Sequence, residues 1–545
     1  MPESHVFDKN RSRKRQDVIP KIGPPESKPS SKNLLNKESE FIELIRQRRM
    51  ERALRIFNDH SKEWSNEIYS PVLIDSFARL LDREPAHLSF VSDCIRRFEA
   101  SSGAGKTEQT IDFGKLTSAD TAHLMLAKAV VKFHSGDYLS AIEDLRFLCR
   151  LADYCEDDDL QKMTRYYLSR ALLRTGSFKE AREEIQKAED IGPHEGVWFD
   201  LLMTKTWIVF NEDSAEEAAA VLKDAEQLLN QRDYVDHANV MTVQGRFARQ
   251  QGDFERAAEL AREAIGIFEK NDDNHHLSLA RAHVHRAFAL LLRAQNEGFR
   301  PLTPEFDELR SEAFDHFREA QKICGDRHHR ILDRIHYFKA AWYFYLEDIS
   351  RARAEADLAY QSAERVSDFV IMAHCRILQT QCARVRNAPD DASRWAMEAD
   401  YLANKTDNRR IKIRALISRA MTEADPPRKN QSMAQKLLDE ARRGLRATDR
   451  DYLRWEFDDL QRQVRALQGV ENTIALHLTL DDVLNDKSLD RTLERLAANI
   501  CEAVYAKRAG SIQRTAQLLG ISRNRVKALC RNLKDQKIDW TNIVK

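Results

Sequence analysis

The chain contains little glycine and proline and has no net charge. Only 17 of its 545 residues are glycine and 13 are proline, so long stretches carry no residue that would end a helix. Its 87 basic side chains balance 87 acidic ones, so the overall charge indicates no nucleic-acid partner for the chain as a whole. The composition favours an all-α protein.

Long apolar runs and paired cysteines are also missing. No stretch approaches the roughly 20 apolar residues that span a bilayer, and the N-terminus shows no apolar signal region, so we expect a cytoplasmic protein with no membrane partner. The eight cysteines include no C-x-x-C pair, which is typical of reduced core thiols. Cys324, His328 and His329 lack a complete ligand set, so we expect no metal and no cofactor.

What the chain does contain is a repeat with a period near 40 residues. Each strong copy has a glycine, an aromatic residue two positions later and an alanine five positions later. The strong copies are Gly136-Asp137-Tyr138 with Ala141, Gly176-Ser177-Phe178 with Ala181, and Gly252-Asp253-Phe254 with Ala257. Weaker copies place the alanine at Ala218, Ala313, Ala352, Ala392 and Ala434. In a helical hairpin the glycine permits the turn, the aromatic ring packs on the neighbouring helix and the alanine allows a close crossing. We therefore predict an α-solenoid of about eight hairpins over residues 118–465.

The repeat resembles the tetratricopeptide repeat, although its period is longer than the usual 34 residues. The resemblance implies a concave groove that binds a protein or peptide. An irregular spacing between Glu297 and Pro304 predicts a lengthened loop. Apolar spacing over residues 39–100 predicts an N-terminal helical capping region, and residues 1–38, rich in Lys, Arg, Ser and Pro, are predicted to be a disordered basic tail.

Residues 101–117 are predicted to be a linker, although they overlap a relaxed phosphate-loop pattern. Ala100 to Thr107, with Lys106, fits that pattern except that alanine replaces its first glycine. A phosphate loop joins a buried strand to a helix, whereas the preceding stretch from Phe90 to Phe98 is charged and amphipathic. We therefore favour a flexible linker and predict no catalytic residues and no enzyme; an ATPase is the rival that this pattern would support.

The C-terminal segment, residues 487–545, predicts a helix-turn-helix. Ala516 is small enough for the helix crossing, Gly520 suits the turn, and Ser522 can cap the second helix. The buried stripe of that helix is predicted to be Val526, Leu529, Cys530 and Leu533. The predicted DNA-binding residues, whose side chains suit base edges and phosphates, are Arg514, Ser522, Arg523, Asn524, Arg525, Lys527 and Arg531.

This segment resembles the helix-turn-helix of the factor for inversion stimulation (Fis) family. The resemblance is carried by Gly510-Ser511, Arg514, Thr515-Ala516 and Gly520-Ile521-Ser522-Arg523. It implies that Arg523 is the main base reader, that Arg514, Arg525 and Lys527 lie nearer the phosphates, and that the protein is a homodimer. Thr515 and Ala528 depart from the family pattern, so its base preference does not carry over.

Local charge agrees with that interpretation. Residues 487–545 contain thirteen Lys or Arg and five Asp or Glu, and such an excess attracts phosphate. Just before them, residues 466–486 are predicted to be a linker or short strand, because apolar residues alternate from Ile474 to Leu480.

The sequence thus predicts a bacterial, sequence-specific transcription regulator that binds double-stranded DNA and associates with the nucleoid when bound. By the Fis resemblance, activation through RNA polymerase is favoured over repression. The alternative is a repeat scaffold that binds proteins without reading DNA.

Overall fold

The computed structural model describes most of the repeat body and part of the C-terminal segment. The described residues are 31–64, 69–101, 118–155, 157–192, 196–212, 215–273, 276–298, 303–325, 329–425, 428–447, 449–467, 497–498, 500–501, 515–516, 519 and 522–534. Within these ranges every regular element is a helix, and no helix is long and apolar enough to cross a membrane.

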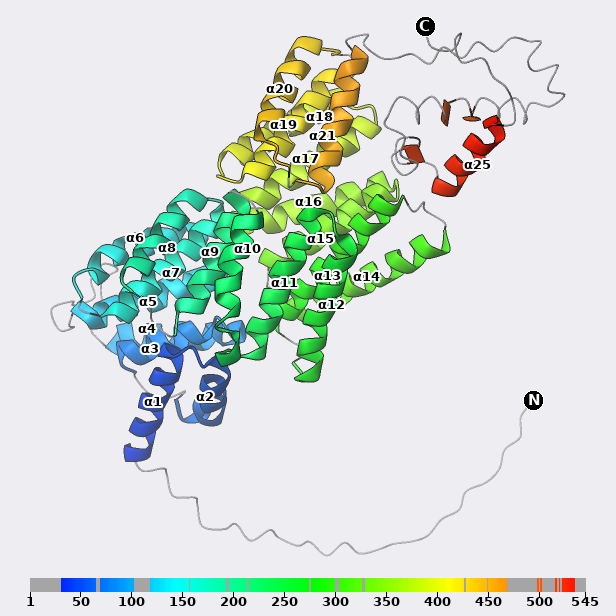
Figure 1. Ribbon diagram of the computed structural model, residues 1–545. Helices are drawn as coiled ribbons and strands as arrows, with labels where there is room; N and C mark the ends of the chain where they lie inside the picture. Colours follow the sequence, from blue (N-terminus) through cyan, green and yellow to red (C-terminus); the bar gives the residue numbers. More distant parts are fainter. Residues whose placement is uncertain are drawn as a thin grey trace, which may run out of the picture.

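An N-terminal unit of helices precedes the repeats (Figure 1). It comprises α1 (Ser31–Arg46), α2 (Met50–Trp64), α3 (Pro71–Leu80), the short 3-10 helix η1 (Pro85–His87) and α4 (Leu88–Ser101). α1 begins inside the segment 1–38 for which composition predicts disorder. Within this helix Lys37 and Glu40 form an ion pair one turn apart, at 2.9 Å. Residues 1–30 lie outside the described part.

Eight antiparallel helix pairs and one closing helix form the body. The pairs are α5 (Ser118–Ser135) with α6 (Tyr138–Ala152), α7 (Asp158–Thr175) with α8 (Phe178–Asp190), α9 (Trp198–Glu212) with α10 (Ala215–Glu226), α11 (Tyr234–Gln251) with α12 (Phe254–Lys270), α13 (Leu277–Glu297) with α14 (Pro304–Cys324), α15 (His329–Tyr345) with α16 (Ile349–Arg365), α17 (Phe369–Val385) with α18 (Pro389–Asn404), and α19 (Arg409–Ala424) with α20 (Gln431–Gly444). The 3-10 helix η4 (Leu229–Gln231) precedes α11, and α21 (Tyr452–Leu467) follows the last pair. The prediction of an all-α solenoid is confirmed.

The alanines of the repeat lie where the helices cross. All eight are buried, with side chains 0–4% exposed: Ala141, Ala181, Ala218, Ala257, Ala313, Ala352, Ala392 and Ala434. A larger side chain at these positions would separate the paired helices, which explains why the alanine persists where the glycine does not.

Six of the eight pairs share one backbone conformation at a described turn position, even where glycine is absent. Gly176 and Gly252 have φ values of 86° and 87°. At the same turn position, later pairs carry Glu347, Asn387 and Lys429 with φ values of 61°, 54° and 44°. A residue with a side chain can adopt this left-handed conformation at a modest cost in free energy, so the later pairs keep the turn although they lack its glycine.

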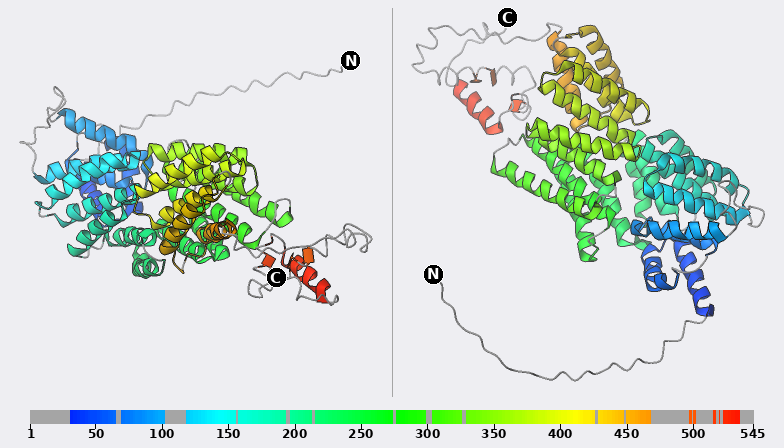
Figure 2. Two further views of the ribbon diagram at one scale, coloured as in Figure 1. Left: turned by 90° about the horizontal axis from the view of Figure 1, so that it is seen from above. Right: turned by 180° about the vertical axis from the view of Figure 1, so that it is seen from behind.

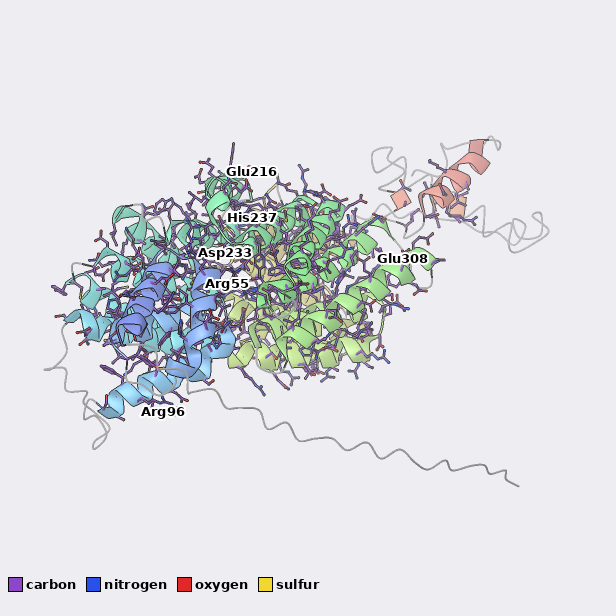
Figure 3. The ribbon with its side chains drawn as sticks, turned by 90° about the horizontal axis from the view of Figure 1, so that it is seen from below. Arg55, Arg96, Glu216, Asp233, His237 and Glu308 are labelled. Atoms are coloured by element: carbon purple, nitrogen blue, oxygen red, sulfur yellow. The ribbon has the colours of Figure 1, made fainter. Side chains whose placement is uncertain are left out.

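Six residues separate α13 from α14, against two between α7 and α8, and the insertion near residue 300 also lengthens both helices. α13 and α14 each have 21 residues, and Ala313 lies at the tenth residue of α14, whereas Ala352 lies at the fourth residue of α16. Gly298 ends α13 in the left-handed conformation, and Thr303 caps α14 ahead of Pro304. The turn-forming residues are therefore helix stop and start signals; Glu308 marks the projecting part of α14 in Figure 3.

A buried ion cluster joins the N-terminal unit to the first repeats. The Asp82 carboxylate accepts hydrogen bonds from Arg48 at 2.9 Å, Tyr167 at 2.8 Å and Arg170 at 2.6 Å, and it lies 3.2 Å from His134. Burial alone would raise the pKa of Asp82, but Arg170 and Arg48 outweigh it and hold that pKa well below its ordinary value. The N-terminal unit is thus bound to the array by charge as well as by apolar packing.

Candidate functional site

The solenoid curves until turns of its early repeats touch loops of its late repeats. A Cβ added to Gly176 would lie 2.7 Å from the Cβ of Thr406, and one added to Gly136 would lie 2.8 Å from Cγ1 of Val366. The backbone N–H of Asp407 donates to the carbonyl of Gly176 at 2.7 Å. Gly136 and Gly176 must therefore be glycine for two reasons: each has a positive φ, and each lies too close to the late repeats to carry a side chain.

A second contact of this kind joins α11 to the loop before α21. The backbone N–H of Arg450 donates to the carbonyl of Gln250 at 3.2 Å, and the rings of Phe254 and Trp455 meet edge to face with centroids 5.6 Å apart. Figure 2 shows the array from two further sides. The concave face of the array, where its early and late repeats touch, holds a partly open cavity.

This cavity has a volume of about 340 Å³. It is lined mainly by the first helices of successive pairs, from α7 to α19, and by the start of α21. Seven arginines and four aspartates are among its lining residues, together with several aromatic rings. Such a mixture of aromatic walls and charged groups is typical of a site for a polar ligand.

The aspartates of the cavity are already paired with arginines. Asp368 accepts from Arg334 at 2.9 Å, and Asp451 accepts from Arg410 in two bonds of 2.6 and 2.7 Å. The other two, Asp200 and Asp236, both accept from Arg232. Each of these four carboxylates is therefore already hydrogen-bonded to an arginine other than Arg246 and Arg249.

Two arginines of α11 differ from the others. In the described part of the chain neither Arg246 nor Arg249 forms an ion pair or a side-chain hydrogen bond, and the buried Nε of Arg246 has no partner. Burial lowers the pKa of Arg246 well below its ordinary value, and the charges of Arg249 and Arg334 lower it further. The folded protein thus holds uncompensated positive charge at this point.

Aromatic rings hold these two guanidinium groups in place. Arg246 lies over Trp207 and Phe210, with its Cζ 4.3 and 5.1 Å from the ring centroids. Arg249 lies over Phe288 at 4.7 Å. A ring face attracts the cation without neutralising it, so the N–H edges stay available to a ligand.

Histidines of the cavity are held neutral. Burial lowers the pKa of His285 well below its ordinary value, the charges of Arg249 and Arg246 add to the effect, and its Nδ1 has no hydrogen-bond partner in the described part. His374 is also lowered, first by burial and then by Arg414, whose guanidinium lies 2.8 Å from its Nδ1. His285 can therefore donate to or accept from a ligand without adding charge.

The C-terminal segment forms a second candidate site around α25 (Arg523–Lys534). Val526 and Leu529 are 0% and 3% exposed and pack with Ala498, Cys501 and Ala516. Their burial agrees with the inward stripe expected from the sequence, as far as its residues are described.

The predicted DNA-binding residues fall into two groups. Ser522 caps α25, its Oγ accepting from the backbone N–H of Arg525 at 3.1 Å, and Asn524, Arg525 and Lys527 are exposed. Arg523 and Arg531 lie in α25, but their side chains, like Arg514 as a whole, are outside the described residues. The predicted strand at 474–480 and the glycine turn at Gly520 also lie outside them.

The cavity arginines were not singled out from the sequence. Arg246 and Arg249 are three residues apart on one helix, and such spacing usually marks a solvated face. The sequence signal is their position among the apolar residues Val243, Phe247 and Ala248, all of which the structure buries. The phosphate-loop pattern continues from α4, a helix, and its residues from 102 onward are not described.

No protein-family model matches the chain, and no curated protein matches it. A crystal structure of a Rap protein complexed with Competence and Sporulation Factor is similar, with a TM-score of 0.50 and 14% identity, over 69% of this chain and 99% of that one. The apo form of the quorum sensor NprR from B. thuringiensis gives a TM-score of 0.44 at 10% identity, over 68% of this chain and 99% of NprR. The likeness to Rap shows that this chain has a tetratricopeptide-like helical repeat fold.

Proposed function

We propose that this chain is a sequence-specific DNA-binding transcription regulator. In this proposal residues 487–545 form a Fis-type helix-turn-helix, and the repeat body binds the signal or the protein to which the regulator responds. One observation carries the proposal: α25 buries Val526 and Leu529 while it exposes Asn524, Arg525 and Lys527. A helix with this division can lie in a major groove and stay packed on its own domain.

The chemistry of α25 suits both parts of DNA recognition. Arginine and asparagine side chains form bidentate bonds with guanine and adenine edges, and lysine neutralises phosphate. The first turn of a recognition helix contacts the bases, which places Arg523 and Asn524 best for reading. The local excess of basic residues would make binding depend strongly on salt.

The remaining parts of the proposal follow from the Fis resemblance. A homodimer would present two reading helices to a palindromic site, and each half-site would add to the affinity. Activation by contact with RNA polymerase is preferred to repression. Activation and repression alike require a cytoplasmic protein that associates with the nucleoid when it is bound to DNA.

The test begins with a genome-wide map of bound DNA, made with the full chain and with a chain lacking residues 487–545. On a site from that map, Arg523→Ala is expected to cost about 1–3 kcal/mol, or about 5- to 150-fold in Kd. Arg318→Ala is the matched control, because that arginine is 75% exposed on α14 of the body. Unchanged operator affinity of the Arg523 variant in a shift assay contradicts the assignment.

A scaffold function is the second candidate, and exposed apolar side chains favour it. Leu139 and Phe147 on α6 are 49% and 52% exposed, and Met397 and Tyr401 on α18 are 57% and 61% exposed. Such side chains on the second helices of pairs are suited to a protein partner. If deletion of residues 487–545 left partner binding and phenotype intact, this candidate would replace the regulator.

A further inference from the structure

We propose that the central cavity binds a small dianionic ligand, a phosphate monoester or a dicarboxylate, anchored by the guanidinium groups of Arg246 and Arg249 with His285 as a further hydrogen-bond partner. This inference deepens the proposed function by naming the chemical class to which the repeat body responds. It depends on the geometry of the cavity and not on DNA reading.

The first argument is uncompensated charge. Removing a guanidinium group from water is costly unless an anion replaces the lost hydration. The neighbouring cavity arginines have that anion: Arg334 has Asp368, and Arg410 has Asp451. Arg246 and Arg249 have no such anion in the described part of the chain, so a negatively charged ligand would provide the missing counter-charge.

The second argument is the number of charges that converge. The unpaired Arg249 disfavours the charged form of Arg246 most among the neighbouring charges, and Arg334 and Arg410 add to this effect although each is paired with an aspartate. A single carboxylate would offset only part of this repulsion, whereas a group with two negative charges would offset more of it. Guanidinium groups also match the paired oxygens of phosphates and carboxylates in two-bond geometry.

The third argument is preorganisation. Stacking on Trp207, Phe210 and Phe288 fixes both guanidinium groups before a ligand arrives, so little side-chain entropy is lost on binding. The buried Nδ1 of His285 also lacks a partner, and an oxygen-rich ligand would provide one.

The size of the cavity restricts the ligand. A volume of about 340 Å³ lies near the lower end of small-molecule sites. It accommodates a small anion and is too small for a folded protein or a duplex. The anionic group therefore belongs to a small molecule or to the end of a short chain.

The experiment uses the full chain without DNA. Pyrophosphate, inorganic phosphate and succinate are titrated by calorimetry and by thermal unfolding, with sodium chloride at equal ionic strength as the reference. We expect saturable binding of at least one probe and a higher unfolding temperature in its presence. Pyrophosphate binding points to a phosphate ligand, and binding of succinate alone points to a dicarboxylate.

Variants then locate the site. Arg246→Met and Arg249→Met are each expected to weaken binding about tenfold or more. Arg256→Met is the matched control, because Arg256 is a half-exposed arginine of α12 that does not line the cavity. Without ligand, the two cavity variants are expected to unfold at or above the wild-type temperature, since each removes a buried, unpaired cation.

Three results would overturn the inference: no saturable binding tighter than about 1 mM for any probe, binding that persists in both cavity variants, or an equal loss in the Arg256 control. Failure of the proposed function gives a different pattern. In that case the dianion still binds, while Arg523→Ala leaves every shift assay unchanged.

Discussion

Substitution of Gly176 by alanine would test whether contact between distant repeats holds the array closed. Gly176 has a φ of 86°, and its added Cβ would lie 2.7 Å from Thr406. Gly298 also ends a helix at positive φ, 67°, but apart from its own chain neighbours and helix no described atom lies within 4 Å of its added Cβ. Both alanine variants bear the backbone cost, and only the first meets Thr406.

The expected costs differ accordingly. An alanine in the left-handed region costs roughly 1–2 kcal/mol, which is the whole effect expected for Gly298→Ala. Overpacking a tight contact costs a further 1–3 kcal/mol or so, which gives about 2–5 kcal/mol for Gly176→Ala. Gly252→Ala should resemble Gly298→Ala, because its nearest neighbour would lie at an ordinary 3.5 Å.

Two measurements separate these effects. Urea unfolding gives the total cost, although long repeat arrays can unfold in several steps, so a local probe is needed as well. Hydrogen exchange of the Asp407 amide, which donates to Gly176, provides that probe. Its exchange should accelerate in Gly176→Ala and stay unchanged in Gly298→Ala.

Equal costs for Gly176→Ala and Gly298→Ala, together with unchanged exchange at Asp407, would refute the closure argument. That result would mean that Thr406 moves aside freely and that contact between repeats contributes no measurable stability. If Gly176→Ala lowered the free energy of unfolding without faster hydrogen exchange at the Asp407 amide, the strain would not lie at the contact between Gly176 and Thr406.

Two further predictions concern buried charge near the N-terminal unit. Burial opposes the charge of His123, but the carboxylates of Asp157, 3.7 Å away, and Asp75, hydrogen-bonded at 2.8 Å, outweigh it and raise its pKa to about 9. This raised pKa contributes about 3 kcal/mol to the free energy of unfolding, fully present below the unfolded pKa near 6.5 and lost as pH rises through 9. The difference in unfolding free energy between wild type and His123→Gln should therefore narrow between these pH values. A difference that stays constant contradicts the assignment. Asp82→Asn leaves buried cations without their shared anion and should lower the free energy of urea unfolding by about 3–5 kcal/mol. The control Asp391→Asn, at an exposed carboxylate, should change it little. Equal effects of the two substitutions would show that the charge of Asp82 does not hold the cluster together.

The sequence predicted the individual hairpin well, for physical reasons that are local. A turn residue, a packing ring and a crossing alanine act within about 40 residues, so Gly176, Phe178 and Ala181 indicate the structure of their own pair. The same logic found Ala352 and Ala392 where glycine had been replaced. It did not predict that the insertion near residue 300 also lengthens α13 and α14, because stop and start signals do not give the lengths of the flanking helices.

The cavity could not be predicted in this way because it depends on curvature. Each repeat adds a small rotation to the array, and only the sum over several repeats brings Thr406 onto Gly176. The α25 face is an intermediate case. Its stripe is local and was predicted, while the roles of Arg514, Arg523 and Arg531 stay predictions that the DNA-binding assays must test.

Closure of the array and occupancy of the cavity are linked through the same residues. The cavity wall runs from Tyr166 on α7 to Tyr452 on α21, so it is complete only when distant repeats touch. A dianion held by Arg249 would also attract Arg410, which lies on the later repeats. If the proposed ligand binds there, it would bind the closed array better than an open one and would therefore stabilise the closed form. Because such coupling is reciprocal, we expect that a change which loosens the contact between Gly176 and Thr406 would weaken dianion binding to the same degree.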